Sequence, residues 1–507
     1  MYKLGVRDKR DSLRPAFYKG RYKALYLSLA SLFVANAVPI FVTQAHAETS
    51  FERLSSLLAN TPEGGWVKAS TNLFSDAWPT GADRVQFASN EWPGSVVRAW
   101  SSFAWDPEGG QLMIFGGGHA NYVGNEMYVW DGATGNWGRG SLPSKTDMDG
   151  FVIGGTAPQS AHTYDNNLYL PVNKMFLTFG GAAAKTGSNF QTITDDGTMR
   201  RAGPYLWDPE KADPTKVGGS NDIGWNPNNQ AENGNMWTDR HEQWTGTEAP
   251  GYINSTTAYR TENGQDVVYV TADRQASGFP SLYRYTLGDV RNGELDKWER
   301  IGVSVHSLGS QNAGTLDTEH NLYIKTALVR GSYTKDLTVW DLDNANPAQP
   351  HLNPDIGINL VKEDGSDFVM TGAFGIDYDT ANNALVMWDG KGDGGTVWTA
   401  PVITDENGNI GANTTWTVYE MDSATENHPH GNFATGVLGK WHYDEKLDAF
   451  IALDEIAHVG GGAWDASVWL YKPTAVPEPE TYALLLAGLG LVGWAARKRT
   501  RDGQARS

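Results

Sequence analysis

Short apolar runs, each broken by a tight turn, recur along most of the chain. In residues 103–137 the runs FAWD, QLMIF and MYVWD are separated by turns rich in Gly, Asn and Asp, and Trp137 marks a fourth run. This spacing is typical of an antiparallel meander of four strands. One such sheet cannot bury both of its faces, so we expect similar sheets to stack against it.

The same cadence predicts five further sheets. Each begins with an apolar strand that ends at a turn, continues through a second apolar strand and a glycine-rich loop, and reaches an aromatic strand. Sheets are expected at 103–137, 162–208, 257–301, 313–341, 374–420 and 438–471, with the fourth strand of the 313–341 sheet not located. The first turns are marked by Asp106, Asp165, Asp317, Asp379 and Asp444.

A spare strand at 66–69 precedes the first sheet, and the last sheet lacks a fourth strand. Pairing the two would close a ring and leave no open sheet edge. We therefore predict an all-β fold, a six-bladed β-propeller of four-stranded sheets whose N-terminal strand closes the last blade. A seventh blade within 209–254 remains open as an alternative. FGGG at 115–118, FGG at 179–181 and tryptophans at blade ends make residues 66–475 resemble kelch-like bacterial β-propellers.

The first 47 residues have the pattern of a signal peptide with a long basic leader. Residues 1–23 carry eight Lys or Arg, residues 24–42 are apolar, and Ala45 and Ala47 supply the small residues of a cleavage site. We expect signal peptidase to cut after Ala47, with an uncut membrane anchor as the alternative. Residues 48–65 are expected to form a polar linker or a short helix.

The C-terminal residues 476–507 carry a second targeting pattern. Pro477, Glu478 and Pro479 precede an apolar run at 482–496 and a basic cluster at 497–499. This order resembles the PEP-CTERM sorting signal of Gram-negative bacteria, which implies processing by an exosortase in organisms that make extracellular polysaccharide. The run is shorter than the roughly 20 residues of a stable membrane-spanning helix. We expect a short hydrophobic helix at each end of the chain, transient membrane association through the C-terminal one, and delivery to the periplasm, outer surface or extracellular matrix.

Composition narrows the chemistry. The chain has no cysteine, which excludes disulfides, thiolate catalysis and a copper site built on a Tyr–Cys crosslink. Its formal net charge is −19 although both ends are basic, so the middle is strongly acidic and should repel nucleic acid. Two neighbouring histidines at 428 and 430 without a third ligand make a weak metal motif, so we expect no metal and no cofactor.

Candidate site residues gather in the loops that a propeller places around one mouth of its central channel. These are the loops between second and third strands and the segments that lead into each blade. Against the acidic body they carry cationic, imidazole, amide and aromatic groups suited to a ligand with carboxylates or sulfates. The ligand-binding candidates are Arg98, Asn121, Tyr122, Arg240, His241, Arg330, Lys391, His430, His458 and Trp464.

Two functions fit this mouth. The first is non-catalytic binding of extracellular polysaccharide or another envelope component. The second is a polysaccharide lyase, in which a uronate carboxylate is neutralised and a His or Tyr moves the proton. The catalytic set would then be His119, His162, Tyr164 and Arg274. A propeller fold by itself does not choose between them.

Overall fold

The structure is a computed structural model that describes most of the chain between residues 48 and 475. The described residues are 48–84, 92–147, 150–152, 157–184, 186–193, 197–219, 231–247, 249–253, 255–272, 281–306, 311–326, 335–370, 373–392, 394–405, 409–411, 414–431, 433–457 and 464–475. Both targeting segments, with their apolar runs, lie outside these residues. Within the described ranges, no helix combines the length and the apolar character needed to cross a membrane.

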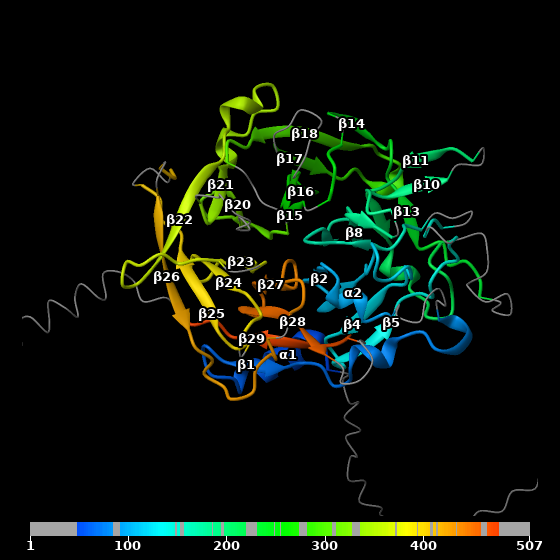
Figure 1. Ribbon diagram of the computed structural model, residues 1–507, viewed down its shortest axis with the longest axis horizontal. Coiled ribbons are helices and arrows are strands. Elements are labelled where there is room, and N and C mark those ends of the chain that lie inside the picture. Colours follow the sequence, from blue (N-terminus) through cyan, green and yellow to red (C-terminus); the bar gives the residue numbers. More distant parts are fainter. Residues whose placement is uncertain are drawn as a thin grey trace, which may run out of the picture. The chain divides into compact units, whose positions relative to one another are not determined.

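Six blades of at least four strands follow one another along the described part of the chain (Figure 1). The first three blades are β2–β5 (Phe103–Asp106, Gln111–Ile114, Tyr128–Asp131, Asn136–Arg139), β7, β8, β12 and β13 (Asn167–Leu170, Met175–Thr178, Tyr205–Trp207, Trp237–Asp239), and β15–β18 (Thr256–Glu262, Gln265–Ala272, Ser281–Thr286, Asp296–Val303). The next two are β19–β22 (Gly314–Asp317, Leu322–Thr326, Leu337–Asp341, Ile356–Lys362) and β23–β26 (Gly375–Asp379, Ala384–Trp388, Val397–Pro401, Thr415–Met421). Their outer strands β22 and β26 pair in parallel and merge the two blades into one eight-stranded sheet.

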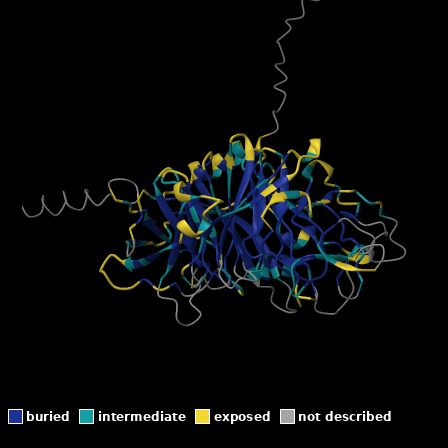
Figure 2. Cartoon of the chain, turned by 90° about the horizontal axis from the view of Figure 1, so that it is seen from above, coloured by how far each residue is buried: buried dark blue, intermediate teal, exposed yellow. Residues whose placement is uncertain are grey.

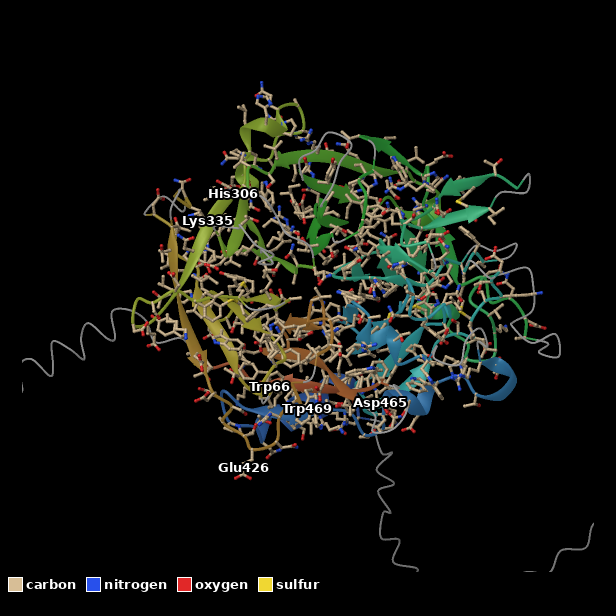
Figure 3. The ribbon with its side chains drawn as sticks, viewed as in Figure 1. Trp66, His306, Lys335, Glu426, Asp465 and Trp469 are labelled. Atoms are coloured by element: carbon tan, nitrogen blue, oxygen red, sulfur yellow. The ribbon has the colours of Figure 1, made fainter. Side chains whose placement is uncertain are left out.

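The sixth blade joins the two ends of the described chain. It consists of β27 (Trp441–Asp444), β28 (Ala449–Ala457) and β29 (Trp464–Tyr471), with β1 (Trp66–Lys68) as its outer strand. β1 runs antiparallel to β29, with Trp66 opposite Tyr471 and Lys68 opposite Trp469. Figure 3 labels Trp66 and Trp469 close together in this blade. The predicted closure of the last blade by the N-terminal strand is confirmed.

The first strand of each blade faces the centre of the ring, and successive first strands meet. β2 contacts β7, β15 contacts β19, and β19, β23 and β27 follow in turn. The Phe103 amide donates to the Gly439 carbonyl at 3.0 Å, which brings the first blade against the last. In Figure 2 the buried residues follow the strands and the exposed residues lie mainly in the turns.

Three expectations about individual strands need correction. The first strand of the second blade is β7 and not residues 162–165, so Asp165 precedes this strand and does not end it as Asp106 ends β2. The fourth strand of the fourth blade is β22, which two short 3₁₀ helices, Leu342–Asn344 and Pro350–Leu352, separate from β21. The described residues of 209–254 form no seventh blade, because β13 completes the second blade and β14 (Trp244–Gly246) pairs in parallel with β18.

Tryptophans fill the spaces between neighbouring blades. Trp130, Trp207, Trp340 and Trp469 occupy the third strands of four blades and are fully buried. A Cβ on Gly140, at the end of the first blade, would lie 2.9 Å from the Trp207 ring, and one on Gly302 would lie 2.8 Å from the Trp340 ring. The glycine at the end of one blade therefore makes room for the tryptophan of the next, which explains why the sequence is rich in both.

The segment before β1 is an ordered helix. α1 (Ser50–Ala59) begins at a capping box in which Thr49 and Glu52 satisfy each other's backbone amides. Leu54 and Leu58 are buried and pack into the core of the first and sixth blades. Two further strand pairs, β6 (Ala161–His162) with β9 (Ala182–Ala183) and β10 (Gln191–Ile193) with β11 (Met199–Arg201), lie in the long connections of the second blade.

Candidate functional site

Strand order gives the ring two distinct ends. We call the end with the loops between second and third strands, and the segments leading into first strands, the loop face. The opposite end carries the hairpin turns between first and second strands, and we call it the turn face. His119 and Asn121 lie in the loop between β3 and β4, while His162 and Tyr164 lie in the segment that leads into β7. All four belong to the loop face.

These four predicted residues come together. The rings of His119 and His162 are 5.9 Å apart, and those of His162 and Tyr164 are 6.1 Å apart. Asn121 Nδ2 lies 3.0 Å from His162 Nε2 and donates to the His119 carbonyl at 2.8 Å. His119 is exposed, Asn121 is half-buried and His162 is buried, so the cluster leads from the surface into the ring.

Trp100, which the sequence analysis did not single out, completes this cluster. Its ring centroid lies 4.7 Å from that of His162, and its carbonyl accepts a hydrogen bond from the Tyr164 amide at 2.6 Å. Trp100 and Tyr164 both have left-handed backbone conformations, with φ of 45° and 49°. Such conformations are uncommon for bulky residues and concentrate at functional sites. They are visible only in the folded backbone, because no local sequence signal marks them.

The glycine run at 116–118 allows the cluster to form. A Cβ on Gly118 would lie 2.3 Å from the His162 backbone nitrogen, and one on Gly116 would lie 2.9 Å from the Ala161 carbonyl. Only glycine permits this approach of the β3–β4 loop to β6. The FGGG motif thus brings His119 beside His162.

Burial sets the protonation of His162. Removal from water, together with the neighbouring His119, lowers the pKa of His162 to about 4. The Asn121 amide nitrogen can only donate hydrogen bonds, so His162 Nε2 is the acceptor in the bond between them. His162 is therefore a neutral imidazole at neutral pH.

Other predicted residues lie on the loop face outside this cluster. The Arg98 guanidinium stands 4.9 Å from the Trp464 ring centroid, a cation–π arrangement. His430 Nδ1 lies 2.7 Å from Asp454 Oδ2, and the His430 side chain is 53% exposed. Lys391 lies in the β24–β25 loop and is half-buried.

Three predicted residues make buried contacts within the protein. Tyr122 is fully buried and donates to Glu126 Oε1 at 2.7 Å. Arg240 binds both carboxylate oxygens of Asp296, at 2.6 and 3.0 Å, in a buried ion pair between the outer strands of two blades. His241 lies beside this pair, 5.4 Å from the Trp244 ring, and burial lowers its pKa. Arg274, Arg330, His458, Pro477, Glu478 and Pro479 lie outside the described residues.

A second group of polar side chains lies on the ring axis, and the sequence analysis did not predict it. Asp165 accepts hydrogen bonds from the Gly314 and Thr257 amides at 2.8 and 3.3 Å, and burial raises its pKa to about 8. His442 Nδ1 lies 3.5 Å from Asp377 Oδ2. Asp377 and His442 each stand two residues before the end of an inner strand, and this shared position could have indicated that they lie near each other. In the described ranges no group of three or more His, Asp and Glu side chains is placed to hold a metal ion.

Comparison with known proteins supports the sorting signal. Residues 475–499 match the family model of the PEP-CTERM protein-sorting motif. This motif indicates an exported protein that is sorted to the surface of a Gram-negative bacterium and recognised by an exosortase-type enzyme. No curated protein matches the chain.

Two solved structures show a weak likeness to the fold. One is a periplasmic gluconolactonase from Pseudomonas aeruginosa, at 12% identity and a TM-score of 0.31, covering 78% of this chain and 89% of that one. The other is a protein provisionally assigned as a 6-phosphogluconolactonase from Bacteroides uniformis, at 9% identity and a TM-score of 0.30, covering 72% and 83%. Likeness at this level carries no argument about function.

Proposed function

We propose that this exported, surface-sorted propeller binds an extracellular polysaccharide or another envelope component through its loop face. The observation that carries the proposal is the convergence of His119, Asn121, His162 and Trp100 from three separate segments of the chain. Imidazole and amide groups beside an aromatic ring offer the hydrogen bonds and the flat apolar surface that sugars use. The kelch-like character of the repeats remains part of this proposal.

The charges on this face extend the binding surface. Arg98 over Trp464 presents a cation and a ring together, and exposed His430 adds an imidazole. Because the body of the protein is acidic, an anionic polymer would be held at these positions and repelled elsewhere.

Binding of the full-length protein to a panel of polysaccharides tests the proposal. We expect retention on at least one polymer, a loss of about five- to tenfold in affinity for Asn121→Ala, and a similar loss for His119→Ala. His351→Ala is the matched control, because His351 is an exposed histidine on the Pro350–Leu352 turn. Equal binding by all three variants would exclude this face as the binding surface.

A polysaccharide lyase is the second candidate, and the exposed imidazole of His119 beside His162 favours it. In such a reaction a base removes the proton α to the uronate carboxylate, the bond to the leaving oxygen breaks, and a double bond forms in the sugar ring. Because Asn121 occupies His162 Nε2, exposed His119 is the better-placed base of the two. Release of unsaturated uronate, followed by absorbance, should then disappear in His119→Ala; release that continues would remove His119 from the mechanism.

A further inference from the structure

The turn face has a cavity of its own on the ring axis. Its volume is about 220 Å³, and all six inner strands and several of their hairpin turns line it. The cavity is smaller than the roughly 300–1,000 Å³ of pockets for drug-sized ligands. The cavity would hold a ligand of one six-membered ring, but not a chain of several such rings.

Five of the six inner strands each place one aromatic ring on the wall of this cavity. One residue near the turn end of each inner strand lines it, in chain order Trp105, Tyr169, Tyr259, Leu316, Tyr378 and Tyr443. Several polar tips of these rings are already bonded: Tyr259 donates to Asp266 at 2.8 Å and Tyr443 to Asp448 at 2.7 Å. The rings are therefore held in place, and what they offer a ligand is apolar surface.

Asp377 is the acceptor that a ligand can reach. Asp377 and His442 both line the cavity, with side chains 21% and 25% exposed. The Asp377 carboxylate accepts hydrogen bonds from the Thr315 hydroxyl and from the amides of Tyr378 and Tyr443. These bonds fix its orientation, and its exposed part faces the cavity.

The electrostatics of the cavity disfavour anions. Of the described residues that line it, none is Lys or Arg, whereas Asp377 and Glu445 are carboxylates. Burial acts to lower the pKa of His442, but the hydrogen bond to Asp377 and the nearby Asp165 carboxyl outweigh it and raise this pKa. A ligand that donates hydrogen bonds fits the Asp377 and Glu445 carboxylates, and a ligand carboxylate does not.

We propose that this axial cavity binds a single non-anionic sugar ring, a hexose or a hexosamine, with hydroxyl or amino groups donating to Asp377. The apolar face of the ring would lie against the aromatic wall. The site is separate from the loop face, because Asp165 closes the channel between them. Asp165 is buried, and its carboxylate contacts the third and fourth blades and lies against Gly439 of the segment that leads into the sixth.

Calorimetric titration of the full-length protein with glucose, glucosamine and glucuronate tests this inference. We expect binding of glucose and glucosamine, with glucosamine favoured, and at least tenfold weaker binding of glucuronate. Asp377→Asn should remove the preference for glucosamine. Ala258→Leu, which adds bulk to the cavity wall, should weaken both sugars at least tenfold. The control Val305→Ala lies at an exposed position and should change nothing.

The results separate this site from the loop face. His119→Ala should leave monosaccharide binding unchanged, and Ala258→Leu should leave polysaccharide retention unchanged. An NMR signal of a histidine ring that shifts on addition of glucosamine and is absent in His442→Gln assigns the contact to the cavity. Near-ultraviolet circular dichroism of Asp377→Asn checks that this variant is folded when its sugar preference is measured. Tightest binding to glucuronate, no binding of any sugar to folded protein, or full affinity in Ala258→Leu would each overturn the proposal.

Discussion

The Asp165 carboxylate accepts a hydrogen bond from the Gly314 amide at 2.8 Å, although the two residues stand 149 positions apart. Asp165 leads into the second blade and Gly314 begins the fourth, so the two blades are not neighbours in a ring of six. The side chain must reach toward the axis to make this bond. One buried carboxyl therefore ties non-adjacent blades together.

This carboxyl should make stability depend on pH. Burial raises the pKa of Asp165 to about 8, whereas an unfolded Asp titrates near 3.9. Between these values the folded state keeps a proton that the unfolded state has lost, so the free energy of unfolding falls as pH rises through the window. Asp165→Asn mimics the protonated acid and removes this contribution.

Urea unfolding of both proteins at pH 5 and pH 9 measures the effect. The stability of Asp165→Asn relative to the natural protein should increase by about 4 kcal/mol between pH 5 and pH 9 for a shift of this size. Comparing the two proteins at each pH cancels the other titrating groups. A difference that stays constant between pH 5 and pH 9 would show that Asp165 ionises normally in the folded state.

A second inter-blade bond closes the inner ring. Trp105 Nε1 donates to Asp444 Oδ2 at 2.6 Å, from the first blade to the last, and Asp444 is buried. Trp105→Phe would leave this oxygen without its donor and should cost about 1–3 kcal/mol of unfolding free energy. Trp137→Phe is the matched control, because Trp137 is also buried in the first blade but its Nε1 has no partner among the described residues. Equal losses in both variants would mean that ring volume and not the hydrogen bond decides the cost.

Local patterns predicted most of the propeller. Apolar runs separated by turns give the blades, and the unpaired strands at the two ends give the closure, because both features depend on short stretches of sequence. The second blade was misread because residues 162–165 end in Asp, as the first strands of other blades do, whereas β7 ends at Leu170. The strand β22 was missed because an insertion with two 3₁₀ helices lengthens the connection to it.

The candidate site was only partly predictable for a different reason. Residue type and loop position found His119, Asn121, His162 and Tyr164, which the fold brings together. The same reasoning selected Arg240, yet its partner Asp296 comes from another blade, and sequence gives no sign of an ion pair over that separation. Trp100, Asp165 and the axial cavity follow from three-dimensional approach alone.

The strand that closes the ring should be essential for stability. Trp66 is 2% exposed, and its ring centroid lies 5.0–5.7 Å from those of Trp388, Trp441 and Tyr471. Its Nε1 donates to the Gly395 carbonyl at 2.8 Å. Trp66→Ala should lower the unfolding free energy by about 3–5 kcal/mol, because it empties a packed site. Leu352→Ala, at a 60% exposed position, should have little effect. If chemical denaturation gave similar midpoints for the two variants, β1 would not secure the ring.

The histidine pair on the loop face offers a spectroscopic prediction. Burial is the main cause of the lowered pKa of His162, and His119 adds to it. In His119→Ala the His162 pKa should rise above about 4 but remain below its ordinary value of about 6.5, because burial persists. Titration of the ring signals by NMR measures this, with His351→Ala as control. An unchanged His162 pKa in His119→Ala would mean that the two imidazoles are not electrostatically coupled.

A buried ion pair within the sixth blade also contacts a short helix on the loop face. Lys440 Nζ lies 3.1 Å from Glu455 Oε1, both side chains are fully buried, and Lys440 also donates to the Val97 carbonyl of α2 (Ser95–Arg98) at 3.2 Å. Lys440→Met leaves the Glu455 carboxylate buried without its counter-charge and should cost about 3–5 kcal/mol of unfolding free energy.

Combining Lys440→Met with Glu455→Gln should recover much of this loss, because neutral Gln removes the unpaired charge and keeps an acceptor for the Ala434 amide. A double-mutant cycle by urea unfolding measures the coupling between the two residues. Strictly additive losses would show that the pair contributes no interaction energy. The contact with Val97 supports the segment that carries Arg98 and Trp100. Lys440→Met should therefore also weaken polysaccharide retention under conditions where it remains folded. The double variant still lacks this contact, so it should recover less of the retention than of the stability.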